Sequence, residues 1–125
     1  MGIEFDSRFA AVTTLAVVAI FVVSSIPDLT QLDGPVFNLF CNVLHAPVYG
    51  VVALLWLRTF KARAPIPGRV LAWALMASAA CGVVDEVHQS FVPGRFASAG
   101  DLLTDLVGIG VVLLFKRLPA ATAVR

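Results

Sequence analysis

The sequence predicts an all-α membrane protein, a four-transmembrane-helix bundle that forms a single domain over residues 1–125, with both termini cytoplasmic. Three observations support this prediction. Hydrophobic residues make up 59% of the chain and charged residues only 14%, which is far from the balance of a soluble domain. Four apolar segments have a length that can cross a bilayer, and most lysines and arginines lie on one side of them.

The first two predicted spans are the clearest. Residues 9–26 are apolar apart from threonines and serines. Their exit lacks the small-x-small cleavage site of a signal peptide, and three more apolar segments follow, so we expect this segment to remain as a span. The second span, residues 36–60, contains Pro47 and several polar side chains, but its length is ample for a bilayer.

The last two predicted spans are weaker. The third, residues 70–91, is apolar or small as far as Val84 and becomes polar from Asp85 onward. The fourth, residues 101–118, is close to the lower limit of length for crossing a bilayer. Because both are marginal alone, we expect them to be stabilised by packing against the first two spans.

Basic residues set the predicted orientation. Eight lie on one side of the spans and one, Arg95, lies on the other. The eight are Arg8, Arg58, Lys61, Arg63, Arg69, Lys116, Arg117 and Arg125. The positive-inside rule then places both termini and the loop between the second and third spans in the cytoplasm. The connections 27–35 and 92–100 are expected to face outward.

Polar and ionisable residues from several predicted spans lie near the outer ends of those spans, at the level of the outer leaflet. An acid in the hydrocarbon costs about 2.5 to 3.5 kcal/mol on insertion scales, so such acids usually face a bundle interior or a wet cavity. Helical spacing favours shared faces, because His45 and Tyr49 are four residues apart, as are Asp85 and Gln89. The candidate site comprises His45, Tyr49, Asp85, Glu86, Gln89, Arg95, Ser98, Asp101 and Asp105.

Structural interpretations compete with this site. Ser98 and Asp101 form a Ser-x-x-Asp capping pattern, in which the acid also suits the helix dipole. Pro93 and Gly94 fit the central pair of a type II turn. The sequence leaves three partners possible for Arg95: Glu86, Asp101 or a lipid phosphate. A helix neighbour is expected to approach closely at Gly108.

Neither a metal site nor another cofactor is predicted. A metal held by His45, Glu86 and Asp101 is an alternative, but no fixed ligand spacing supports it. Cys41 and Cys81 lie in apolar segments, where free cysteine commonly packs as a small hydrophobic residue. No basic stripe with interleaved aromatic residues is present, so we expect no nucleic-acid partner.

The polar residues also follow a recognisable order. The chain carries His45-x-x-x-Tyr49, then DEVHQSFVPGR from Asp85 to Arg95, then Ser98, Asp101 and Gly108. Over residues 20–115 this order resembles the VanZ-like family of small bacterial membrane proteins. Two positions depart from the family pattern: Asn42 stands where the family tends to carry a lysine, and Asp105 where it tends to carry an asparagine. Both departures make the site more acidic.

The resemblance implies a multi-pass protein of the bacterial cytoplasmic membrane. It also implies a link to low-level resistance to the glycopeptide antibiotic teicoplanin, because the family is named for a member associated with that phenotype. A fold or family label does not by itself fix an activity, so the biochemical function is sought in the site.

Four functions remain open from the sequence. The first is binding or handling of a membrane lipid or a lipid-linked envelope precursor. The second is an enzyme in which Glu86 or Asp85 is the general base, with His45 and Tyr49 orienting or donating protons. A proton-coupled exporter is less favoured, since no ionisable residue lies between Phe9 and the end of the first span. The fourth is a purely structural role for the charges. The oligomeric state is left open.

Overall fold

The computed structural model describes residues 3–26, 35–63, 65–95 and 97–117, and within residues 35–42 it describes the backbone only. The described residues form four helices and no strand, which confirms the all-α prediction. The helices are α1 (Ser7–Ser24), α2 (Pro35–Thr59), α3 (Gly68–Gln89) and α4 (Ala99–Arg117). Each begins and ends one or two residues before the segment that the sequence predicts. The side chain of Asn42, a departure from the family pattern, lies outside the described residues.

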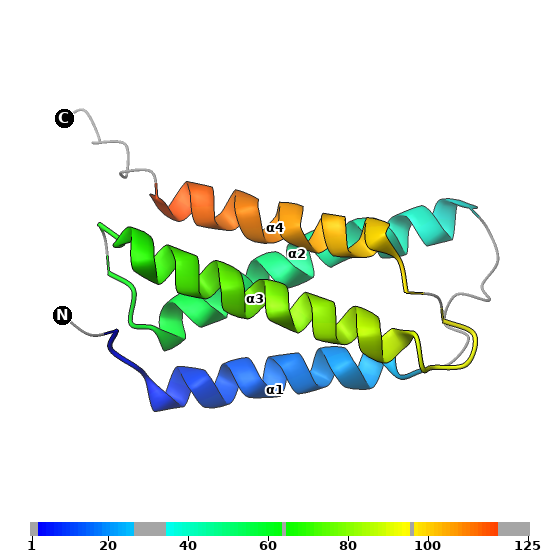
Figure 1. Cartoon of the computed structure of the whole chain (residues 1–125), viewed down its shortest axis with the longest axis horizontal. Helices are drawn as coiled ribbons and strands as arrows, with labels where there is room; N and C mark the ends of the chain where they lie inside the picture. The colour runs from blue at the N-terminus through cyan, green and yellow to red at the C-terminus, as the bar shows by residue number, and fades with distance from the viewer. Residues whose placement is uncertain (1–2, 27–34, 64, 96, 118–125) are drawn as a thin grey trace.

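The four helices run alternately up and down in one bundle (Figure 1). The most extensive packing is between α2 and α4, which are not consecutive in sequence, whereas α1 packs only weakly on α3 and, among the described residues, does not contact α4. The C-terminal ends of α1 and α3 and the N-terminal end of α4 lie at the same end of the bundle (Figure 1). This alternation brings polar residues that are far apart in sequence to one level.

Glycines allow α2 and α4 to approach each other closely. A Cβ atom at Gly108 of α4 would lie only 2.7 Å from the Ala46 Cα of α2. A Cβ atom at Gly50 of α2 would lie 3.4 Å from the Gly108 carbonyl oxygen and 3.1 Å from Val112 Cγ2. Small residues permit such backbone approach in membrane bundles. The prediction for Gly108 is therefore confirmed, and α2 continues as one helix through the neighbouring Pro47.

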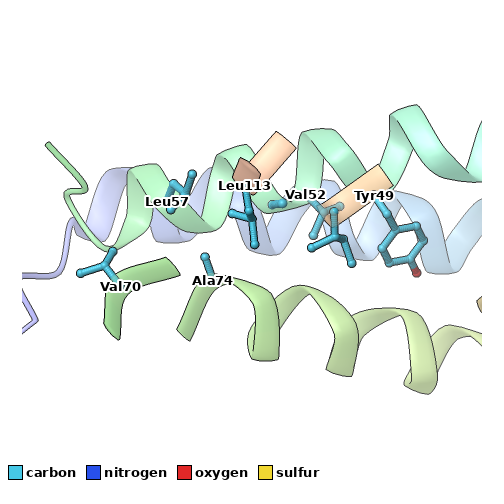
Figure 2. Packing of buried hydrophobic residues seen from close by; sticks show 8 residues of the cluster. Tyr49, Val52, Leu57, Val70, Ala74 and Leu113 are labelled. Carbon is cyan, nitrogen blue, oxygen red and sulfur yellow. The ribbon is translucent and has the colours of Figure 1, made fainter. Parts of the chain in front are cut away.

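A buried hydrophobic cluster, here called the apolar core, fills the middle of the bundle and the half toward the end where α1 begins (Figure 2). It consists of Tyr49, Val52, Ala53 and Leu57 from α2, Val70 and Ala74 from α3, and Ile109 and Leu113 from α4. The first helix joins this half through hydrogen bonds: the Asp6 N–H donates to the Thr59 carbonyl at 2.8 Å, and Thr13 Oγ1 lies 2.9 Å from Thr59 Oγ1. Asp6 also caps α1, since its carboxylate accepts from the Arg8 N–H at 2.9 Å.

Large hydrophobic side chains cover the outside of the bundle. Leu15 on α1, Met76 on α3 and Leu114 on α4 are each about 60% exposed or more. An apolar exterior of this kind suits lipid as solvent and is unusual for a soluble monomer. Among the described helices, α1 and α3 are long and apolar enough to cross a membrane.

Candidate functional site

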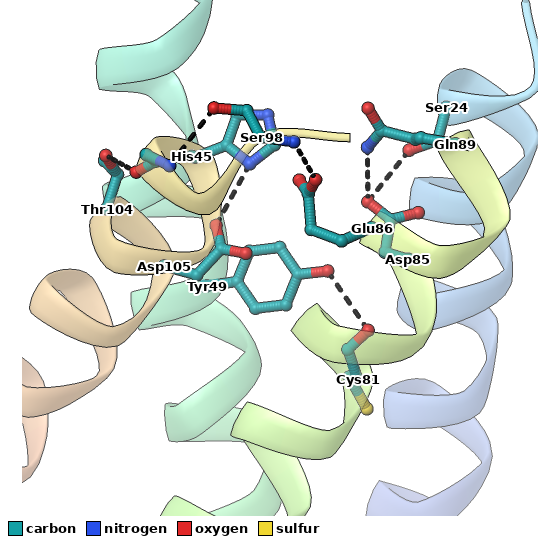
Figure 3. A network of polar contacts seen from close by, with 11 residues as sticks. Ser24, His45, Tyr49, Cys81, Asp85, Glu86, Gln89, Ser98, Thr104 and Asp105 are labelled. Carbon is teal, nitrogen blue, oxygen red and sulfur yellow. Dashed lines mark hydrogen bonds and ion pairs between the residues drawn. The ribbon is translucent and has the colours of Figure 1, made fainter. Parts of the chain in front are cut away.

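Buried and partly buried polar side chains from all four helices meet where α1 and α3 end and α4 begins (Figure 3). We call this group the polar end. It comprises Ser24 of α1, His45 of α2, Asp85, Glu86 and Gln89 of α3, Ser98 just before α4, and Asp105 of α4. Six of the nine residues predicted from sequence lie within the polar end, and Tyr49 lies at its border with the apolar core. The remaining two, Arg95 and Asp101, are described below.

Asp85 links α1 to α3. Its Oδ2 atom accepts hydrogen bonds from Ser24 Oγ and from Gln89 Nε2, each at 3.0 Å. The residue is only 2% exposed. The other carboxylate oxygen, Oδ1, is buried and has no hydrogen-bond partner among the described residues. Gln89 lies one helical turn after Asp85, so the predicted four-residue spacing brings the two side chains into contact.

Glu86 links α3 to the start of α4. Its Oε2 atom accepts a hydrogen bond from the Ser98 N–H at 2.8 Å. Ser98 caps α4 as the sequence predicts, because its Oγ accepts from the Gly100 N–H at 3.1 Å. Glu86 is 7% exposed, and its second oxygen, Oε1, is also buried without a partner among the described residues. Both acids of the Asp-Glu pair therefore retain unused acceptor capacity in the bundle interior.

His45 and Asp105 link α2 to α4. Their Nδ1 and Oδ1 atoms are 3.0 Å apart, and Asp105 is buried while the His45 side chain is 24% exposed. Gly82 of α3 makes room for this pair, since a Cβ atom there would lie 3.0 Å from Asp105 Oδ2. Tyr49 stacks below His45 with ring centroids 6.4 Å apart. The tyrosine hydroxyl points toward the Cys81 carbonyl at 3.5 Å, at the boundary with the apolar core.

Arg95 faces the end of α1. Its Nε and Nη2 atoms donate to the Ile26 and Val23 carbonyl oxygens, each at 3.4 Å. Val23 lies in the last turn of α1 and Ile26 just beyond it, where carbonyl oxygens lack the partners of a continuing helix. The Val23 carbonyl also accepts from the Ile26 N–H at 3.2 Å. The preceding turn has the predicted type II features, because Gly94 has a φ of 79° and the Arg95 N–H donates to Val92 O at 3.1 Å. Arg95 therefore ties the loop after α3 to α1.

Asp101 lies in the first turn of α4, as the capping pattern predicts. Its N–H donates to the Ser98 carbonyl at 3.1 Å. An acid at this position suits the positive end of the helix dipole. Asp101 is half-buried, so it borders the polar end from the side of the loop.

A second polar contact lies on the outer surface of the bundle, where α1 packs against α3. Ser25 Oγ is 2.8 Å from His88 Nε2, and the His88 ring is 5.4 Å from the Phe21 ring. These residues border a shallow apolar groove of about 380 Å³. The groove is lined by Val17, Val18, Phe21, Val22, Ser25 and His88. Neighbouring serines of α1 thus serve different surfaces: Ser24 faces the buried acids and Ser25 faces the groove.

The site cannot be assigned to a metal on its geometry. Within the part of the chain that the structure describes, no group of three or more histidine, cysteine, aspartate or glutamate side chains is arranged to hold a metal ion. The carboxylates are instead bonded to hydroxyl, amide, imidazole and backbone N–H groups. The arrangement is suited to hydrogen bonding with a polar group that offers donors.

Two residues that shape the polar end, Ser24 within it and Gly82 beside it, are not among the candidate residues from sequence. Ser24 and Ser25 both end the first predicted span, and which of them meets the acids depends on the rotation of α1 about its axis. Gly82 was not singled out, because a glycine within an apolar segment gives no chemical signal. Because Gly82 has no side chain, it leaves space for the Asp105 carboxylate.

Comparison with known proteins gives one result. A family model described as VanZ/LLP1 matches residues 5–118. No curated protein and no solved structure matches the chain.

Proposed function

The chain belongs to the VanZ/LLP1 family, and from this premise we propose that its polar end binds or handles a membrane lipid or the head group of a lipid-linked envelope precursor. Through that activity the protein alters the susceptibility of a bacterial cell to teicoplanin. The proposed setting is the cytoplasmic membrane, crossed four times, with both termini cytoplasmic. The distribution of lysine and arginine then turns the polar end outward.

One observation carries the proposal: Asp85 and Glu86 are buried, yet each has a carboxylate oxygen without a partner among the described residues. A buried ionised group costs several kcal/mol unless its hydrogen bonds are completed. Neutral side chains at these two positions would close this end of the bundle at a lower desolvation cost. Unused acceptors in a membrane interior are therefore best explained by a polar ligand that completes them.

The surroundings favour a lipid as that ligand. Apolar side chains on the outer faces of the helices flank the polar end, among them Val84 and Leu103, which are 53% and 63% exposed. The apolar groove along α1 ends at Ser25 and His88, next to the residues that hold Asp85. A molecule with a polar head and an apolar tail matches this combination.

A paired cellular assay tests the proposal. Bacterial cells that lack their own copy would express the wild type, Glu86→Gln, or the matched control Glu4→Gln, whose acid is exposed at the opposite end of the bundle. We expect the wild type to alter teicoplanin susceptibility, Glu86→Gln to lose this effect at unchanged membrane abundance, and Glu4→Gln to behave as wild type. An unchanged phenotype in Glu86→Gln, or abundance that falls together with the phenotype, would count against a working site.

A second candidate function is acid–base catalysis on an envelope lipid. The observation in its favour is the His45–Asp105 contact at 3.0 Å, since a carboxylate that orients an imidazole is the arrangement of an activated general base. Glu86 lies beside this pair in the view of Figure 3. Turnover of a lipid by the purified protein tests this candidate. Turnover that persists in Glu4→Gln and is lost in Asp105→Ala would favour catalysis over binding alone.

A further inference from the structure

The polar end carries three buried carboxyl groups on two helices, those of Asp85, Glu86 and Asp105. His45 is bonded to one of them, Asp105. Among the described residues, no lysine or arginine forms an ion pair with any of the three. The interior of this end therefore presents acceptors and negative charge to whatever enters it.

The arginine of this end does not supply the missing positive charge. The Arg95 guanidinium donates to backbone carbonyls of Val23 and Ile26 at the end of α1. It is directed there by the turn at Pro93 and Gly94. A phosphate group entering among the acids would meet carboxylates that have no lysine or arginine beside them among the described residues, and this arrangement is repulsive.

The unused oxygens show which chemistry is missing. Asp85 Oδ1 and Glu86 Oε1 are buried acceptors without partners among the described residues, and the two residues are 2% and 7% exposed. An ionised carboxylate only accepts hydrogen bonds, whereas a primary ammonium group offers three donors and a positive charge. Hydrogen bonds between such charged partners are about twice as strong as neutral ones.

The position of Glu86 suits a bound cation. In Figure 3 its carboxyl group lies between the His45–Asp105 pair on one side and Asp85 on the other. It is held in that position by the Ser98 N–H at 2.8 Å. The His45 side chain, which contacts Asp105, is 24% exposed, so this pair is not fully buried.

We propose that the polar end binds the primary ammonium group of a membrane amphiphile, so that its preferred lipid carries an amine in the head group. The proposal rests on the function proposed above and names the head-group chemistry of the same site. Glu86 and Asp85 are the ammonium acceptors, and the exposed apolar faces around them accommodate the lipid chains. A free soluble amine shares the ammonium chemistry, but it would not use those faces.

Lipid retention by the purified full chain in detergent, measured by native mass spectrometry, tests this inference. Three lipids with the same dioleoyl chains serve as probes: phosphatidylethanolamine, its N-acetyl derivative and phosphatidylglycerol. We expect phosphatidylethanolamine to be retained at least tenfold better than the other two. Glu86→Gln is expected to lower that retention about tenfold, and the control Glu4→Gln is expected to leave it unchanged.

The possible outcomes separate the two proposals. Equal retention of all three lipids, lowered alike by Glu86→Gln, would overturn the amine preference and leave a lipid site in place. Retention that does not depend on Glu86 would overturn both. Displacement of the lipid by soluble ethanolamine at equal concentration would overturn the requirement for an amphiphile. If Glu86→Gln does not give a folded protein, Asp85→Asn removes charge from the other acceptor and provides the same test.

Discussion

The apolar core and the polar end belong to one bundle, yet they satisfy their polar groups in different ways. Near the apolar core the buried hydroxyls are neutral: Thr13 and Thr59 share a hydrogen bond, and Ser78 donates to the Ala74 carbonyl of its own helix. At the polar end the buried acceptors are instead ionisable carboxyl groups, and Asp85 and Asp105 are bonded to side chains of α1 and α2 respectively. Both carboxylates of the neighbouring pair Asp85 and Glu86 also keep an oxygen without a described partner.

We expect this difference to separate the residues that stabilise the fold from those that bind a ligand. A neutral hydroxyl pair in a membrane bundle contributes about 0.6 kcal/mol and leaves nothing exposed to the interior. Buried carboxyl groups carry a desolvation cost that packing alone does not recover. We therefore expect close packing between α2 and α4 to determine whether the protein folds, and the polar end to determine what it binds. Three substitutions test where this division holds.

The largest effect is expected at Gly108, beside both regions. A valine there would place its Cβ atom against the Ala46 backbone, so that α2 and α4 must separate. Overpacking of this kind costs about 3 kcal/mol, and we expect the loss to appear in unfolding of the purified protein in mixed micelles. The same substitution at Gly110, where nothing lies within 4 Å, is the control and should cost below about 0.5 kcal/mol. Equal losses at the two positions would mean that the α2–α4 contact does not determine stability.

An intermediate effect is expected for Ser24→Ala, which tests the polar end. The substitution removes a hydroxyl donor from the buried Asp85 carboxylate. Hydrogen bonds to charged groups are worth about 1.5 kcal/mol or more, so we expect a loss of about that size in the same unfolding measurement. Ser25→Ala is the matched control, because that exposed hydroxyl bonds its own helix and His88, and its loss should stay below about 0.5 kcal/mol. A neutral result for Ser24 would show that Asp85 does not depend on α1.

Much of the fold could be predicted because its determinants are local. The lengths of the apolar segments located the four helices. The turn at Pro93 and Gly94 and the cap at Ser98 follow from the conformational preferences of those residues. Gly108 was anticipated for the same reason, since only a residue without a side chain permits the backbone approach. The crossing of the membrane by all four helices stays a prediction.

The site could be predicted only in part. Spacing correctly placed Asp85 and Gln89 in contact, because both lie on one helix. The partners of Arg95 could not be anticipated, since they are backbone carbonyls that become available only where α1 ends. Likewise, which serine of α1 meets the acids depends on how that helix rotates against α3, and this rotation is set by packing of the whole bundle.

The smallest effect is expected for Thr59→Val, and it tests the comparison most directly. The substitution keeps the shape of the side chain but removes the hydroxyl that faces Thr13 across α1 and α2. Thr13 Oγ1 retains a hydrogen bond to the Phe9 carbonyl at 2.8 Å, so no donor is left unpaired and the loss should be about 0.6 kcal/mol. Thr14→Val, at an exposed hydroxyl on the same helix as Thr13, should change the unfolding free energy less still. If Thr59→Val cost as much as Ser24→Ala, neutral and charged contacts would stabilise the bundle equally, and the acids of the polar end would have to be regarded as part of its structural support.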